Sequence, residues 1–160
     1  MTITLILLAI LTAPYLAANA IRRSTNFRIN PHKAAILGLA LMFIFTAAGH
    51  FIKTAEMTEM MPPWVPERVL LVYLTGVLEF LIAVGLLIRR RRRVAGLVAI
   101  AALILFFPAN IYAAIHHIPM GGHAWGPSYL FVRVPVQLVI ILWAYWFAVR
   151  ASEADLMIAE

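Results

Sequence analysis

Five polar side chains interrupt long apolar stretches of the sequence, and their types suit proton transfer or the binding of a small polar group. Glu79 and His50 can take up and release protons, whereas Arg133, Asn110 and Gln137 can donate hydrogen bonds. An ionisable group at the centre of a bilayer costs at least ~2.5 kcal/mol on insertion scales, and it normally faces the protein interior or a water-filled cavity. These five residues are therefore the candidate site.

The stretches that carry these residues are long enough to cross a membrane. The chain has 160 residues, of which 64% are hydrophobic and 12% charged, and soluble domains have only ~45–50% apolar residues. A span needs about 20 apolar residues, and five segments fit, at about 1–21, 34–54, 68–88, 94–117 and 129–149. We therefore expect an all-α fold, a polytopic transmembrane helix bundle with five spans. The connections are too short for a soluble domain, so any site lies among the helices or at their ends.

The positions of the five candidate residues along their spans place them at similar depths in the membrane. Glu79 lies eleven residues after Arg68, which is roughly 16 Å into the membrane at 1.5 Å per residue. Thr75, Gly76 and Ala83 share its helix face, and small residues there let another helix approach. The other four candidates fall in the outer half of the bilayer. We expect a polar network or pocket that opens outward among the second, third, fourth and fifth spans.

Two interpretations of this network remain open from the sequence. In the first it is structural, because polar contacts between membrane helices average ~0.6 kcal/mol and fix their register. His50 is then an interfacial histidine, and Arg133 extends its charged end to the outer surface. In the second the network holds a ligand, with Arg133, Gln137 and Asn110 as donors and with Glu79 and His50 handling a proton.

Two finer patterns concern the last two spans. The i, i+3, i+4, i+7 spacing predicts one inward face of the fourth span, made of Asn110, Ala113, Ala114 and His117. Aromatic residues near the inner end of the fifth span are typical of a membrane-interface belt. They are Trp143, Tyr145 and Trp146.

Basic residues indicate the orientation of the chain. Because successive spans alternate direction, ten of the thirteen Lys and Arg residues fall on one face. They are Arg22, Arg23, Arg28, Lys33, the run from Arg89 to Arg93, and Arg150. Lys53 and Arg68 lie on the other face. The positive-inside rule predicts an amino terminus outside and a carboxyl terminus in the cytoplasm. No basic stripe interleaved with aromatics lies on a soluble surface, so we expect the lipid bilayer and not nucleic acid as the partner.

Several kinds of chemistry find no support in the sequence. The chain has no cysteine, which removes thiol–disulfide exchange, iron–sulfur clusters and thiolate metal sites. No pattern indicates haem, flavin, a phosphate loop or a nucleophile–base pair. A lesser alternative is a soft-metal site for Cu(I) on the outer face. Its ligands would come from Met57, Met60, Met61, His116, His117, Met120 and His123.

The first segment ends in small residues, as a signal peptide does, but it lacks a basic n-region. We expect it to be a retained helix, bent near Pro14. The expected organisation is therefore an extra transmembrane helix over 1–21, a transmembrane bundle over 34–150 and a short cytoplasmic tail over 151–160.

Five motifs in the region 34–150 resemble the DoxX-like family of small bacterial membrane proteins. In chain order they are AAGHF (47–51), MPPWVP (61–66), TGVLEF (75–80), FPANIYAA (107–114) and RVPVQ (133–137). The resemblance implies a four-helix membrane core in a bacterial plasma membrane. It also implies that His50, Glu79, Asn110, Arg133 and Gln137 occupy characteristic family positions.

The resemblance also implies a functional context. The family takes its name from a subunit associated with quinone-linked oxidation in sulfur-metabolising archaea, and related members are linked to redox-stress complexes or to partner assembly. It thus implies an accessory subunit of a membrane redox system, with a quinone as ligand and redox proteins as partners. The alternative is a non-catalytic scaffold or assembly factor. Whether the chain catalyses a reaction stays open.

Overall fold

The computed structural model describes residues 2–24 and 30–150, and these residues form helices and connecting turns without a strand. The elements are α1 (Thr2–Ser24), α2 (Pro31–Ile52), α3 (Thr54–Glu59), α4 (Arg68–Leu87), the 3₁₀ turn η1 (Arg89–Arg91), α5 (Arg92–Ile115), the 3₁₀ segment η2 (His123–Tyr129), α6 (Leu130–Ala144) and the π-helical turn η3 (Tyr145–Arg150). Five segments are long and apolar enough to cross a membrane. The predicted all-α bundle of five spans is confirmed, and the chain is a multi-pass membrane protein.

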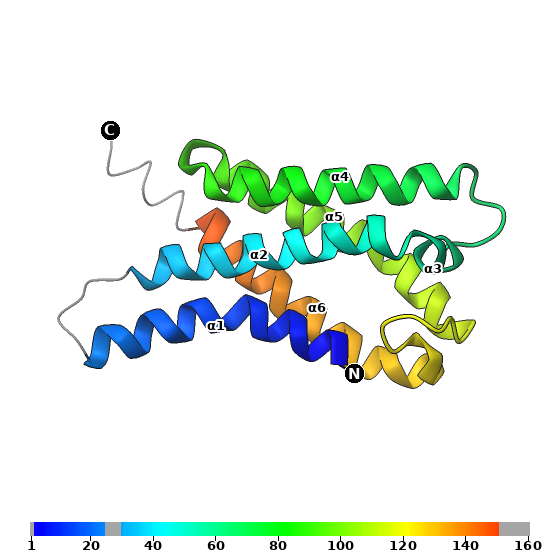
Figure 1. Ribbon diagram of the computed structural model, residues 1–160, viewed down its shortest axis with the longest axis horizontal. Coiled ribbons are helices and arrows are strands. Elements are labelled where there is room, and N and C mark those ends of the chain that lie inside the picture. The colour runs from blue at the N-terminus through cyan, green and yellow to red at the C-terminus, as the bar shows by residue number, and fades with distance from the viewer. Residues whose placement is uncertain (1, 25–29, 151–160) are drawn as a thin grey trace.

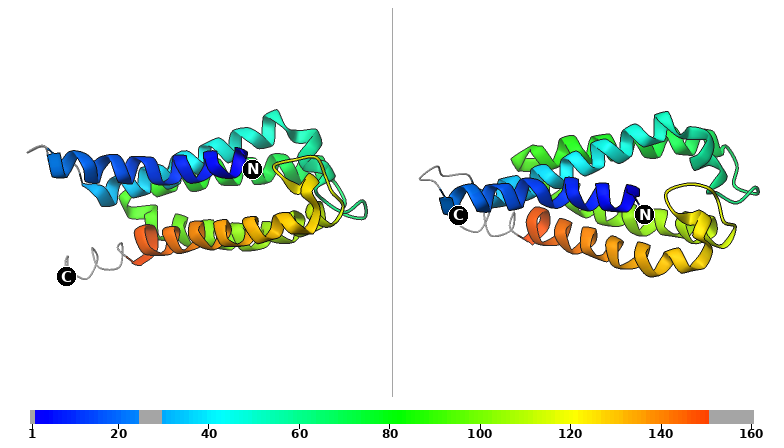
Figure 2. Two further views of the ribbon diagram at one scale, coloured as in Figure 1. Left: turned by 90° about the horizontal axis from the view of Figure 1, so that it is seen from below. Right: turned by 60° about the horizontal axis from the view of Figure 1, so that its bottom comes forward.

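The five long helices run alternately in opposite directions (Figure 1). They form two layers, with α1, α2 and α4 on one side and α5 and α6 on the other (Figure 2). Helix α2 lies between α1 and α4, and α5 contacts both α4 and α6. The turn between α4 and α5 lies at the same end as the end of α1 and the beginning of α2 (Figure 1). Most of the basic residues therefore gather at one end of the bundle.

The beginning of α2 follows from its local sequence. The Asn30 side-chain oxygen accepts hydrogen bonds from the backbone N–H groups of His32 at 2.9 Å and Lys33 at 3.4 Å. Such a cap satisfies donors that have no partner in the first helical turn. Pro31 follows at the first helical position, where its missing N–H costs nothing. These two residues set the point at which the chain turns back into the bundle.

Helix α1 packs closely on α2 at a glycine. A Cβ atom on Gly38 would overlap the carbonyl oxygen of Leu11 and would lie 3.2 Å from that of Ile10. Pro14 lacks the N–H that would normally bond to the Ile10 carbonyl. Leu7 and Leu11 are buried in the core of the bundle. The extra N-terminal helix is therefore an integral part of this bundle.

The predicted inward face of the fourth span is correct for three residues and wrong for His117. Asn110, Ala113 and Ala114 are buried. Helix α5 ends at Ile115, and His117 is exposed with a positive φ of 54°. Helical spacing does not apply beyond the helix end, so the position of His117 could not follow from it.

The aromatic belt prediction is wrong for Trp143. Its indole N–H donates a hydrogen bond to the Ala35 carbonyl at 3.1 Å, which joins α6 to α2. Its ring also packs edge-on against Tyr15, with 5.5 Å between ring centroids. Tyr145 and Trp146 are exposed, and for these two residues the belt stays a prediction.

Substitution of Gly38 by alanine tests the α1–α2 contact. We expect Gly38→Ala to lower the melting temperature in detergent, because the added methyl group meets backbone atoms that cannot move aside. Gly49→Ala is the matched control, since a Cβ there meets only the flexible end of Met57 at 3.4 Å. The control should be neutral or stabilising, because alanine favours a helix by ~1 kcal/mol over glycine. Equal melting temperatures for the two variants would contradict the close contact.

Candidate functional site

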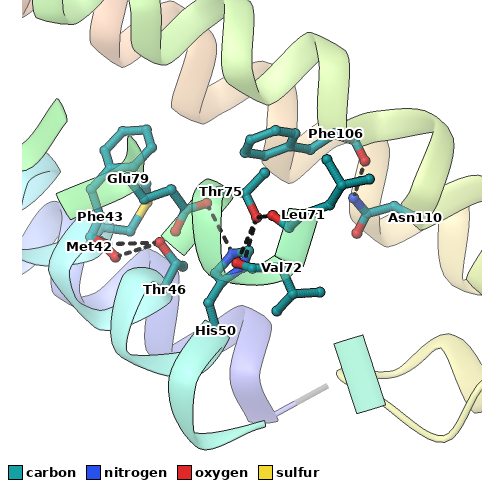
Figure 3. Close-up of polar contacts among 10 residues, drawn as sticks. All are labelled: Met42, Phe43, Thr46, His50, Leu71, Val72, Thr75, Glu79, Phe106 and Asn110. Atoms are coloured by element: carbon teal, nitrogen blue, oxygen red, sulfur yellow. Dashed lines mark hydrogen bonds and ion pairs between the residues drawn. The ribbon is translucent and has the colours of Figure 1, made fainter. Parts of the chain in front are cut away.

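His50 of α2 faces Glu79 of α4 across the seam between the two helices. His50 Nε2 lies 3.6 Å from Glu79 Oε1, and Glu79 is only 7% exposed. On the other side of the ring, Nδ1 lies 2.9 Å from the Val72 carbonyl oxygen and 3.1 Å from Thr75 Oγ1 (Figure 3). The seam thus holds an acid–base pair whose imidazole is fixed on both edges.

The contact with Val72 determines where the ring carries a proton. A carbonyl oxygen only accepts hydrogen bonds, so His50 Nδ1 must carry the hydrogen. The ring then faces Glu79 through Nε2, which lies 3.6 Å from Oε1. The two groups are therefore an acid and a base in close proximity, one from α2 and one from α4.

A glycine allows this close approach. A Cβ on Gly76 would lie 2.7 Å from His50 Cβ, which is shorter than two carbon atoms permit. Gly76 and Thr75 precede Glu79 by three and four residues on one face of α4. The inward face predicted from small residues around Glu79 is therefore present, and its function is to admit α2.

A cavity of about 60 Å³ lies beside Glu79 inside the bundle. Its polar wall comes from α2, α4, α5 and α6, and consists of Thr46, Glu79, Asn110, Arg133 and Gln137. A water needs about 10–15 Å³ of such space and two or more polar partners. The cavity is thus large enough for several waters or for a small polar group. Four of the five candidate residues line it, and the fifth, His50, touches Glu79.

Helix α1 also contributes to this cavity, through Leu7. The sequence places the polar network among the second, third, fourth and fifth spans and assigns no part of it to the first. An apolar residue such as Leu7 carries no sequence signal that separates a cavity wall from a lipid-facing surface. The contribution of α1 is visible only when the helices are packed.

Two polar atoms of the cavity residues are buried without a hydrogen-bond partner. They are Glu79 Oε2 and Arg133 Nε. Arg133 is attracted electrostatically to Glu79, but the two described side chains make no direct ion pair. A buried polar atom without a partner costs about 1–3 kcal/mol. Two side chains that line the cavity therefore each carry one polar atom that the described residues leave without a partner.

The two amide side chains are tied to the backbone of α5. Gln137 Nε2 donates to the Leu103 carbonyl oxygen at 2.6 Å, and Asn110 Nδ2 donates to the Phe106 carbonyl oxygen at 2.9 Å. Pro108 lies inside α5 and lacks the N–H that would bond to Ile104, the residue after Leu103. Membrane helices tolerate such a proline when a neighbouring helix supplies donors. Gln137 supplies one, and it holds α6 against α5.

A second polar group, at the end of the bundle where α1 begins, was not expected from the sequence. Thr4 Oγ1 lies 3.0 Å from the Tyr129 hydroxyl group, which joins α1 to η2. The ring of His123 packs edge-on against Tyr129, with 4.8 Å between centroids. Thr4 and Tyr129 are 125 residues apart, and no local pattern indicates such a pairing. This contact holds the beginning of α1 at the mouth of the bundle.

The histidines of the soft-metal alternative have other contacts. His123 Nδ1 lies 2.6 Å from the Met120 carbonyl oxygen, and the His116 ring stacks on Tyr112 at 3.9 Å. Within residues 2–24 and 30–150, no three side chains of His, Cys, Asp or Glu gather as metal ligands. This finding does not concern methionine ligands, so the soft-metal site stays a prediction.

The fold and the site together define a multi-pass membrane protein with a polar cavity inside its helical bundle. The chain belongs to the family described as Domain of unknown function (DUF8561), whose model matches residues 39–148. The matched part includes all five candidate residues and leaves out α1. No curated protein and no solved structure matches the chain.

A double-mutant cycle tests the His50–Glu79 pair. We expect His50→Gln and Glu79→Gln to be non-additive in the free energy of unfolding, with a coupling of about 1 kcal/mol, within the range found for polar pairs between membrane helices. The matched cycle combines Glu79→Gln with His116→Gln, because His116 is exposed and stacks on Tyr112 far along the chain. That second cycle should be additive. Additivity in both cycles would show that the His50–Glu79 contact contributes nothing.

Proposed function

We propose that this membrane protein binds a hydrophobic small molecule and holds its polar head in the cavity between Glu79 and Arg133. The observation that carries the proposal is the pair of buried, unpartnered atoms, Glu79 Oε2 and Arg133 Nε, in one cavity. Both would be satisfied by a head group that accepts a hydrogen bond from the guanidinium and donates one to the carboxylate. The charges remain inside the bundle because such a molecule, or water in its absence, compensates them.

The neighbouring groups suit a head that exchanges protons. His50 and Glu79 can each take up and release a proton, and His50 Nε2 lies 3.6 Å from Glu79 Oε1. The other carboxyl oxygen of Glu79, Oε2, has no hydrogen-bond partner. Carbonyl and hydroxyl oxygens of a quinone and its reduced form accept and donate in this way. On the resemblance to the DoxX-like family, we extend the proposal to a quinone ligand and to an accessory subunit of a membrane redox system. A redox partner protein would then supply the electrons.

One set of contacts favours a second candidate, a scaffold or assembly factor. The side-chain nitrogens of His50, Asn110 and Gln137 that form hydrogen bonds all meet backbone carbonyl oxygens. The contacts of His50 and Gln137 join two helices, hold them in register and need no ligand. They do not explain why Glu79 Oε2 and Arg133 Nε are buried without hydrogen-bond partners. Ligand binding would supply those partners and therefore accounts for more of the site. A Glu79→Gln variant that is as stable as the wild type but no longer functions would exclude the scaffold.

Removal of the arginine charge tests ligand binding. We expect the purified protein to carry a polar-headed lipid-soluble molecule, detected by mass spectrometry, and to melt at a higher temperature when a quinone is added. Arg133→Met should lose both effects, because the donor in the cavity is gone. Arg68→Met is the control, since Arg68 bonds to the Met61 carbonyl at 3.3 Å outside the cavity. The proposal fails if the wild type carries no such molecule and its melting temperature does not respond to quinone.

We also propose that the chain lies in a bacterial plasma membrane with its amino terminus outside. Support comes from the basic residues, since Arg22, Arg23 and the arginines of η1 lie at one end of the bundle (Figure 1). The five-arginine run suits the cytoplasmic side, because the anionic lipids of that leaflet attract basic residues by roughly 1 kcal/mol each. Arg28 and residues 151–160 lie outside the described residues.

Introduced cysteines test this orientation, because the chain has none of its own. Glu59 and Arg90 are both exposed and lie at opposite ends of the bundle. We expect a membrane-impermeant maleimide to label Glu59→Cys in intact spheroplasts and Arg90→Cys only after the membrane is opened. The reverse labelling pattern would invert the proposed topology.

A further inference from the structure

A second hollow lies between α5 and α6, on the outside of the bundle. It measures about 190 Å³ and is lined by Ile104, Phe107, Val134, Gln137, Leu138 and Ile141. Gln137 is its only polar lining residue, and no charged side chain reaches it. Ile104 is 56% exposed and Leu138 is 53% exposed. In a membrane this groove therefore faces the acyl chains of the bilayer.

The groove adjoins the polar cavity through one side chain. Gln137 lines the groove and also lines the cavity that contains Glu79 and Arg133. The residue is only 6% exposed, so it lies at the boundary of the two spaces and does not extend into lipid. Its amide nitrogen is held by the Leu103 carbonyl oxygen at 2.6 Å. Within the described residues the amide oxygen has no hydrogen-bond partner.

We propose that the groove between α5 and α6 binds the apolar tail of the molecule whose polar head occupies the inner cavity, and that Gln137 contacts the junction of head and tail. This inference rests on the proposed function and adds the entry side and the class of ligand. The ligand is an amphiphile with a small head, able to accept from Arg133 and donate to Glu79, and with an unbranched or isoprenoid chain. It enters sideways from the bilayer, and no aqueous channel is needed.

The groove can add only a small part of the binding free energy of the ligand. Lipid tails are as apolar as leucine, so a tail that moves from bilayer to groove gains only van der Waals packing. The groove therefore orients the ligand and adds a modest part of its affinity. Discrimination between ligands comes from the head, where Gln137, Glu79 and Arg133 lie. A molecule with a tail and no suitable head would bind the groove no better than bulk lipid.

A groove-filling substitution tests the inference, with two quinones of the same head as probes. One is a benzoquinone with a ten-carbon tail, and the other lacks the tail. Leu138→Trp places a large side chain in the groove, whereas Val139→Trp places it on a neighbouring lipid-facing position that does not line the groove. Isothermal titration in detergent measures the dissociation constant of each probe for the full-length chain. Ile104→Trp and Leu105→Trp form a second pair of the same design.

We expect Leu138→Trp to weaken binding of the tailed probe about tenfold, which is about 1.4 kcal/mol, and to leave the tailless probe unchanged. Val139→Trp should change neither. Two results would overturn the proposal that the groove binds the tail, without contradicting head-group binding in the cavity. They are equal effects of Leu138→Trp and Val139→Trp on the tailed probe, and equal binding of the two probes by the wild type. Binding of neither probe by the wild type would overturn the proposed function and this inference together. Co-purification of phospholipid alone, undisplaced by the tailed probe, would assign the groove to bulk lipid and overturn the inference.

Discussion

The cost of placing the Glu79 carboxylate inside a membrane governs much of this structure. A charge at that depth needs a partner, a cavity or a proton. His50 provides a partner at 3.6 Å, and the cavity of about 60 Å³ beside Oε2 provides space for water or a polar head. Arg133 adds an opposite charge on the same cavity without closing onto the carboxylate. The bundle therefore places the two side chains on one cavity without a direct ion pair between them.

Close helix contacts are what make this arrangement rigid. Membrane helices associate without a hydrophobic driving force, so they depend on packing at small residues and on polar contacts. Gly38 brings α2 against the backbone of α1, and Gly76 brings α4 against His50. Pro108 interrupts the hydrogen bonds of α5, and Gln137 of α6 supplies a donor nearby. Of these residues, Gln137 also lines the cavity and the neighbouring groove.

The sequence alone determined the number of spans, their approximate ends and the inward direction of the candidate residues. These follow from local physical chemistry, because about 20 apolar residues cross a bilayer and a polar group there must face the interior. Four candidates do line one cavity, and His50 does contact Glu79. The same local reasoning was wrong for His117, where the helix had ended, and for Trp143, whose indole N–H bonds to Ala35.

Only the tertiary structure decided how these residues meet. The Nδ1 hydrogen of His50 follows from the Val72 carbonyl on another helix, and the lack of a direct Arg133–Glu79 ion pair follows from how α4 and α6 pack. The Thr4–Tyr129 hydrogen bond joins α1 to η2, and Leu7 brings α1 to the cavity. Such contacts depend on the register between helices, which is set by packing among residues far apart in the sequence. Hydropathy and spacing within one helix carry no information about that register.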